Sequence, residues 1–413
     1  MHHLIKSVRV VDPASVWNGH LVDVELKGGL ITAIGTQLAS AGQVWDYRGA
    51  CLSPGWVDVG AYAEDPGQEH REDLHSLAEA ARAGGFTQVV IQPDAQPVRH
   101  DKSGILYVKT QARGLPARLH PMGALSRDLA GREISEMIDM HQAGAVAFTD
   151  SGHPVQHAGL LLRALLYVKA FGGLVIHQPL DETIAPGGQM HEGLMSTSLG
   201  MRGIPALAEE IMVERDLRLL AYTESRLHLA NISTAGAVAR IREAKQAGLA
   251  VTASAPALNL LFTDEAVATF ESNFKVMPPL RSEADRQALL GGLADGTIDW
   301  IGANHRPLEP EAKVLEFPYA DFGAVGLESC FGVLRRATAG IFDIAALIDR
   351  MSVRPRAILG LDPACIAVGE KADLTLFDAD ADWVFGEADL RSKSKNSPLP
   401  GVSLKGRALA TFV

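Results

Sequence analysis

The hydrophobic pattern of the chain separates two β-rich ends from a long middle section. At both ends, short apolar segments finish at turns that contain glycine or an Asp-Pro pair, as strands of a small antiparallel sheet do. These segments are 4–11, 21–26, 30–34, 372–378 and 402–413. Because the two ends share this texture, we expect residues 1–53 and 367–413 to form one composite β-sandwich domain.

The middle section alternates strand-like apolar runs with helical stretches that end at glycine. The predicted strands are 56–62, 87–92, 117–122, 145–149, 174–177, 226–231, 250–254 and 299–303. Eight strand–helix alternations in this length are typical of an α/β TIM (β/α)8 barrel. We therefore predict a barrel domain over residues 54–366.

The clearest predicted helix covers residues 234–247. Ser233 or Thr234 can cap its first turn, and Gly248 can end it. Its apolar stripe consists of Ala237, Val238, Ile241 and Ala244. This stripe has the spacing of a helix face packed on a barrel.

Composition narrows the class of protein. The net charge of −11 gives no basic surplus for nucleic acid or an anionic membrane. The three cysteines, Cys51, Cys330 and Cys365, do not have the Cys-x-x-Cys spacing that is typical of metal or redox sites. Reduced thiols are therefore expected. No signal-like start or long apolar run is present, and a cytoplasmic location is expected.

The segment after residue 52 resembles the first barrel strand of the dihydroorotase branch of the amidohydrolase superfamily. That branch carries Pro-Gly-x-x-Asp-x-His-x-His-x-x-x-Pro-Gly, and Pro54-Gly55, Asp58 and Pro66-Gly67 keep its frame. The two histidine positions hold Gly60 and Tyr62 instead. The resemblance runs in one order along nearly the whole chain, and it implies the same barrel fold.

The resemblance also implies where metal ligands and the catalytic acid would stand. Asp150 and His177 keep the acid after strand four and the histidine of strand five. After strand six, Asn231 replaces a histidine in a His-Val-Ser-Thr motif. After strand eight, Asn304 replaces the catalytic aspartate of Ala-Thr-Asp-His-Ala-Pro. With Gly60 and Tyr62, the zinc site is predicted to be lost.

The positions that bind the substrate in this family also hold different residues in this sequence. The arginine that grips the dihydroorotate carboxylate in the family corresponds to Glu64, and Asp94 and Met277 replace two binding asparagines. An anionic substrate would meet like charges at Glu64 and Asp94, which weakens binding.

The resulting expectation is a catalytically inactive dihydroorotase homologue without a zinc cofactor. It resembles pseudo-dihydroorotases that act as assembly partners of aspartate carbamoyltransferase, and a homo-oligomer is expected. A first alternative is a cyclic amide hydrolase with a rewired metal site that uses Asp150, His177 and His305. A second is a hydantoinase-like or collapsin-response-type structural homologue that forms tetramers without catalysis.

Overall fold

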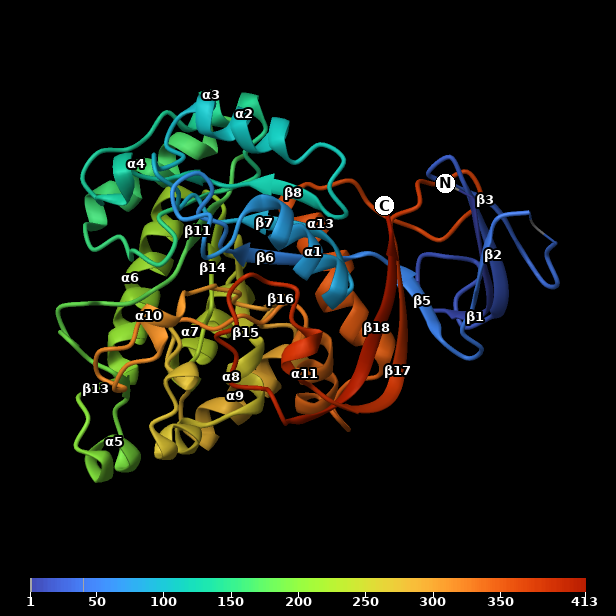
Figure 1. The fold of residues 1–413 in the computed structure, drawn as a ribbon. Coiled ribbons are helices and arrows are strands. Elements are labelled where there is room, and N and C mark those ends of the chain that lie inside the picture. Colours follow the sequence, from blue (N-terminus) through green and yellow to red (C-terminus); the bar gives the residue numbers. More distant parts are fainter. Residues whose placement is uncertain (1, 40) are drawn as a thin grey trace.

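A computed structural model describes residues 2–39 and 41–413, and it consists of a barrel with a sheet at its side. The sheet is built from both ends of the chain (Figure 1). Its strands are β1 (His2–Val10), β2 (Leu21–Lys27), β3 (Leu30–Gly35), β4 (Gln43–Asp46), β5 (Cys51–Pro54), β17 (Leu374–Val384) and β18 (Ser403–Phe412). The long β17–β18 hairpin runs along the flank of the barrel, where β18 packs on α1 and α11.

The strands from the two ends are joined directly by hydrogen-bonded pairing. β5 pairs parallel with β1 and antiparallel with β17, so β17 lies beside the N-terminal strands. Buried side chains from both ends, including Val24, Leu52 and Leu376, form one apolar cluster. Strands from both ends therefore belong to one seven-stranded sheet, and not to the two separate sheets of a sandwich, because β5 pairs directly with strands from each end. The domain division into 1–53 with 367–413 and 54–366 stays a prediction.

All eight predicted barrel segments contain a strand, and these strands are parallel to their neighbours. They are β6 (Trp56–Ala61), β7 (Phe86–Ile91), β8 (Arg118–Pro121) with its continuation β9 (Gly123–Ala124), β10 (Phe148–Thr149), β11 (Val175–His177), β14 (Leu227–Leu229), β15 (Val251–Pro256) and β16 (Trp300–Gly302). They form two ladders, β6–β7–β8 and β9–β10–β11–β14–β15–β16. The strand break at Met122 separates β9 from β8, and the sequence pattern did not predict it.

The two ladders are linked at both edges. Near the first edge, the Val146 amide donates to the Pro121 carbonyl at 3.2 Å. At the second edge, the Tyr62 amide donates to the His305 carbonyl at 3.0 Å, so β6 and β16 meet. One apolar cluster takes side chains from five successive strand segments, among them Val57, Val90 and Ile176, as a barrel interior does.

Helices follow most of the strands and cover the barrel. They are α1 (Leu74–Gly84), α2 (Lys102–Gln111), α3 (Met137–Ala143), α4 (Ala158–Lys169), α6 (Ala206–Thr223), α7 (Ala235–Gln246), α8 (Ala257–Leu261), α9 (Glu283–Asp295), α11 (Cys330–Ala337), α12 (Ile344–Ile348) and α13 (Arg354–Leu359). The predicted helix 234–247 is α7, capped by Thr234 and not by Ser233. Its predicted apolar stripe is buried.

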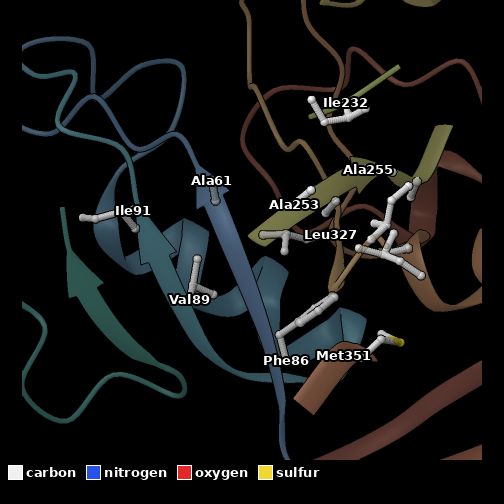
Figure 2. Close-up of a cluster of buried hydrophobic side chains, with 14 of the residues drawn as sticks. Ala61, Phe86, Val89, Ile91, Ile232, Ala253, Ala255, Leu327 and Met351 are labelled. Carbon is white, nitrogen blue, oxygen red and sulfur yellow. The ribbon is translucent and has the colours of Figure 1, made fainter. Parts of the chain in front are cut away.

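The large core lies between the strands and these helices. Figure 2 shows part of it, with Val89 and Phe86 from β7, Ala253 from β15, Leu327 from the turn before α11 and Met351 from η4 (Asp349–Val353). Interdigitated apolar side chains of this kind fix the positions of the strand ends. The strand ends therefore form a rigid frame for the residues that follow them.

Several short elements project beyond the carboxyl ends of the strands or cross them. These are β12 (Met190–His191), α5 (Leu194–Leu199), β13 (Gly203–Ile204), η2 (Asp264–Thr269), η3 (Ser272–Phe274) and α10 (Pro310–Lys313). Within the described ranges, no helix is long and apolar enough to cross a membrane. Cys51 and Cys330 are buried, Cys365 is half-buried, and all three are free thiols.

Candidate functional site

The candidate site lies at the carboxyl ends of the barrel strands, where the sequence predicted it. Gly60 lies in β6, His177 ends β11, and Tyr62, Asp150, Asn231 and Asn304 follow β6, β10, β14 and β16. This end is where barrel enzymes place their chemistry. The structure therefore gathers these residues at one end of the barrel, but their side chains do not converge on one point.

His177 has both ring nitrogens occupied by protein groups. Its Nε2 accepts a hydrogen bond from the Val155 amide at 2.9 Å, so its Nδ1 carries the proton and donates to Asp216 Oδ2 at 2.5 Å. Arg215 holds the other oxygen of Asp216. A histidine ligand needs a free ring nitrogen lone pair. In this arrangement His177 offers none.

Asp150 is also turned toward the protein. Its Oδ1 accepts from the Ser126 amide at 2.8 Å and its Oδ2 from the Ser126 hydroxyl at 2.5 Å. Burial raises the pKa of this carboxyl group, and the bonds from Ser126 oppose the rise. Each oxygen of Asp150 therefore has a hydrogen-bond partner in Ser126.

His305 is fully buried on a different set of partners. Its Nδ1 accepts from the Gly326 amide at 3.1 Å, and its Nε2 lies 3.6 Å from Glu72 Oε2. Across the described parts of the chain, no three His, Cys, Asp or Glu side chains lie where they could hold a metal ion together. The residues proposed for a rewired metal site, Asp150, His177 and His305, are thus each engaged separately.

The positions where the resemblance implies histidines and an aspartate carry other chemistry. The Asn231 amide donates to Gln178 Oε1 at 3.2 Å and to Asn304 Oδ1 at 3.4 Å, and Asn304 donates to the Met277 carbonyl at 3.1 Å. Neutral amides in such a chain satisfy one another and carry no charge for a metal. Gly60 adopts φ +101°, and a β-carbon there would lie 3.2 Å from Gln92 Nε2, so a larger residue is strained at this position.

Tyr62 fills the centre of the site. Its ring is buried, and its hydroxyl accepts a hydrogen bond from the Ser151 hydroxyl at 3.0 Å. The guanidinium carbon of Arg306 lies 4.9 Å from the ring centroid, in a cation–π contact. Burial raises the pKa of the Tyr62 hydroxyl, so the phenol stays protonated at neutral pH.

The space left in the site is very small. A hollow of about 20 Å³ remains, close to the volume that one water needs. Its walls are Tyr62, Gly152, Gln178, Met277, Asn304, Arg306, Phe322 and Gly323. A larger hollow of about 750 Å³ lies elsewhere, between η2, the segment around α10 and residues 393–396. The hollow around Tyr62 therefore has no room for a cyclic substrate, and the hollow of about 360 Å³ that shares Met277 and Phe322 with it is lined by residues 180–189 instead of the strand-end positions.

Two carboxylates stand at the rim. Glu64 Oε2 lies 3.5 Å from Arg71 Nη1, and Asp94 Oδ1 lies 3.8 Å from His153 Nε2. Burial raises the pKa of Glu64, an effect that Arg71 opposes. Both acidic side chains lie near the Tyr62 hydroxyl, where they act electrostatically on it together with Arg306.

Arg306, Gln178 and Ser151 belong to the site and were not among the residues predicted for it. A signal for Arg306 was visible, since it stands where the family motif has alanine, directly after Asn304 and His305. Ser126 and Asp216 carried no such signal. Their contacts with Asp150 and His177 depend on how separate strand–helix units meet.

Comparisons with known proteins extend these observations. The dihydro-orotase-like family profile matches residues 49–237. A dihydroorotase of Pelotomaculum thermopropionicum is 41% identical over 418 residues, covering 100% of this chain and 97% of that protein. A dihydroorotase of Syntrophus aciditrophicus is 38% identical over 418 residues, covering 100% of this chain and 98% of that protein.

Solved structures support the same architecture. The L-hydantoinase (dihydropyrimidinase) of Arthrobacter aurescens has a TM-score of 0.86 at 24% identity, covering 99% of this chain and 94% of that chain. The dihydropyrimidinase of Brevibacillus agri has a TM-score of 0.83 at 21% identity, covering 100% of this chain and 94% of that chain. These likenesses show that this chain shares the fold of these two structures, an α/β barrel.

Proposed function

This chain belongs to the dihydroorotase-like family, and we propose that it is a member without hydrolase activity. The observation that carries the proposal is the state of the six strand-end positions. Four hold Gly60, Tyr62, Asn231 and Asn304 in place of ligands or the catalytic acid. The other two, Asp150 and His177, bind protein groups with the atoms that a metal would need.

A zinc ion does not fit the residues present. Zinc in a hydrolase requires three or more imidazole, thiolate or carboxylate ligands around one open position. The amides of Asn231 and Asn304 are poor substitutes, and the Tyr62 phenol is protonated. The standard route, in which a metal-bound water attacks a cyclic amide, therefore has neither its nucleophile nor its proton acceptor here.

The substrate side leads to the same proposal. A carboxylate on a dihydroorotate-like ligand needs a cation close to it, but Glu64 stands at the arginine position and Asp94 is a second acid, while the cation in the wall, Arg306, lies over the Tyr62 ring. The hollow of about 20 Å³ is too small for a six-membered ring.

We further propose a partner role, as a non-catalytic assembly subunit of aspartate carbamoyltransferase. The support is the resemblance to pseudo-dihydroorotases together with a fold that is kept while its pocket is filled. A barrel surface can serve as an interface after its pocket has lost catalysis, because outer helices and strand ends are separate parts of the fold.

The first experiment measures zinc and hydrolysis in the same sample. After equilibration with zinc and dialysis, we expect far less than one zinc per chain and no hydrolysis of dihydroorotate. The Pelotomaculum thermopropionicum dihydroorotase is the positive control. One zinc per chain in this protein, lost in an Asp150→Ala/His177→Ala variant, would overturn the proposal in favour of a rewired hydrolase.

The second experiment tests the partner. This protein and the aspartate carbamoyltransferase of the same organism are mixed and separated by size-exclusion chromatography with light scattering. We expect one joint peak that carries the carbamoyl transfer activity. Separate peaks with unchanged transferase activity would contradict the partner role and leave the loss of hydrolysis to be judged by the first experiment.

A further inference from the structure

Arg306 has an unusual environment for a half-buried arginine. Among the residues that the structure describes, its side chain makes no hydrogen bond and no ion pair, and its Nε is buried without a partner. Its described side-chain interaction is the contact with the Tyr62 ring at 4.9 Å. A guanidinium normally uses its donors on carboxylates or carbonyls, so this position calls for an explanation.

Arg306 lies within electrostatic range of both an acidic and a basic side chain, Glu64 and Lys313. The side chains of Glu64 and Asp94 are only 17% and 14% exposed. Asp94 Oδ2 is buried and has no hydrogen-bond partner in the described structure. Burial raises the pKa of Glu64, Arg71 opposes this rise directly, and Arg306 adds a smaller opposing effect. The guanidinium of Arg306 thus acts on Glu64 through space, without direct pairing.

The backbone around Arg306 provides space for it and for Tyr62. A β-carbon on Gly152 would lie 3.1 Å from Tyr62 Oη and 3.5 Å from Arg306 Nη1. A β-carbon on Gly323, at φ +155°, would lie 3.1 Å from the Arg306 stem. The absence of side chains at these two positions therefore leaves room for the stacked pair at the centre of the barrel mouth.

We propose that Arg306, stacked on Tyr62, is the resident cation of this pocket and holds the place that a bound metal ion takes in a metal-dependent barrel. Its positive charge acts on Glu64 in addition to that of Arg71, and its bulk closes the pocket. This inference goes beyond the loss of hydrolysis, because it gives Arg306 a role in filling the pocket and in its charge. It stands whether or not the chain binds a transferase.

The proposal has a specific consequence. Removing the charge of Arg306 leaves Glu64 and Asp94, which act on the Tyr62 hydroxyl, with less positive charge around them. Carboxylate oxygens suit a hard divalent cation such as Ca²⁺, which accepts flexible geometry. The Arg306→Gln variant keeps part of the side-chain stem and loses the charge, so it should acquire a response to Ca²⁺ that the natural protein lacks.

The experiment compares thermal midpoints with EDTA and with millimolar Ca²⁺. We expect Arg306→Gln and Arg306→Ala to melt a few degrees lower than the natural protein in EDTA, and Ca²⁺ to restore at least half of the loss. Arg306→Lys keeps a cation and should show no response. The matched control Arg113→Ala removes an exposed arginine distant in sequence from Arg306. It should change neither the midpoint in EDTA nor the response to Ca²⁺.

The Ca²⁺ response must depend on the two acids. Adding Glu64→Gln and Asp94→Asn to Arg306→Gln should abolish it, and this variant remains informative if Arg306→Ala does not fold. An unchanged midpoint for Arg306→Gln, or an equal Ca²⁺ response in the natural protein, would overturn the proposal. So would acetate or inorganic phosphate raising the midpoint of the natural protein but not of Arg306→Gln, since Arg306 would then be an anion clamp.

Discussion

At the scale of single residues, His177 keeps one contact that is typical of a metal-binding histidine, while its other ring nitrogen contacts the protein backbone. Its Nδ1–H donates to a buried carboxylate, Asp216, as many metal-binding histidines do. The opposite nitrogen accepts the Val155 amide instead of facing a metal. The identity of a residue therefore does not define its role, because a single backbone N–H can take the lone pair that matters.

Asp58 belongs to the retained family motif and is fully buried on β6. Its Oδ1 accepts from the Ala303 amide at 2.7 Å, and its Oδ2 has no partner among the described residues. Burial raises its pKa to about 6, while the Ala303 bond and the nearby His305 oppose the rise. Cys330 is close enough to be affected by the same charge.

This raised pKa predicts a pH-dependent effect of Asp58→Asn. The folded state holds a proton at pH values where the unfolded state has released it, so Asp58 costs stability as pH rises from about 4 to about 6. We compare the free energy of unfolding of Asp58→Asn with that of the natural protein. Between pH 4 and pH 7.5 this difference should shift in favour of the variant by on the order of 1–3 kcal/mol. Urea unfolding at several pH values measures this, and parallel stability curves for the two proteins would contradict it.

At the scale of elements, the junction between α6 and α7 is organised around one buried acid. Glu209 of α6 accepts hydrogen bonds from the amides of Ser233 and Thr234 at 2.9 and 3.0 Å. It also accepts from both of their hydroxyl groups, and Arg281 lies 3.9 Å away. The backbone between β14 and α7 is therefore fixed, and with it the position of Asn231.

The cap of α7 provides the prediction at this scale. Thr234 Oγ1 accepts from the Ala237 amide at 3.2 Å and donates to Glu209. Thr234→Ala loses both contacts and should lower the free energy of unfolding by about 1–2 kcal/mol. Thr234→Ser keeps the hydroxyl and is the matched control, which should lose much less. Equal losses in the two variants would show that the methyl group, not the cap, matters.

At the scale of the whole molecule, Asp373 connects the terminal sheet to the barrel. It precedes β17, accepts from Arg356 of α13 at 3.2 Å on each oxygen, and also accepts from Gln88 of β7 at 2.7 Å. Burial tends to raise its pKa, but Arg356, Arg118, Thr87 and Gln88 together lower it. The carboxylate is therefore charged in the folded protein and joins three parts of the chain.

We expect Asp373→Ala to be strongly destabilising, because it leaves the buried Arg356 without its partner. Breaking one side of a buried pair costs about 3–5 kcal/mol. A lowered pKa gives stability that is present above the unfolded pKa near 4 and is lost as pH falls below it, so the difference should shrink at low pH. Asp380→Ala, at a carboxylate whose side chain is 79% exposed, is the control and should change stability by less than about 1 kcal/mol. A similar loss in both variants would contradict the role of the junction.

The order of the elements was predictable from the sequence because it depends on local periodicity. Burial and helix geometry leave a pattern among neighbouring residues. This pattern revealed the eight apolar runs, the apolar stripe and cap region of α7, and the glycines that end helices. The strand-end substitutions at Gly60, Tyr62, Asn231 and Asn304 could also be read directly, since the family motif fixes their places. The pairing of β5 with strands from both ends could not, because strand partners far apart in sequence leave no local signal.

The sequence by itself determined which chemical groups reach the mouth of the barrel, and only the tertiary structure decided what they do there. Asp150 and His177 are present in the sequence, but their contacts with Ser126, Asp216 and Val155 arise where separate strand–helix units pack together. The contact of Arg306 with Tyr62 is a second example, because these residues follow the last and the first barrel strand and meet only in the folded barrel. The physical reason is that residue type sets the available donors and charges, whereas hydrogen-bond partners depend on distances that folding alone establishes.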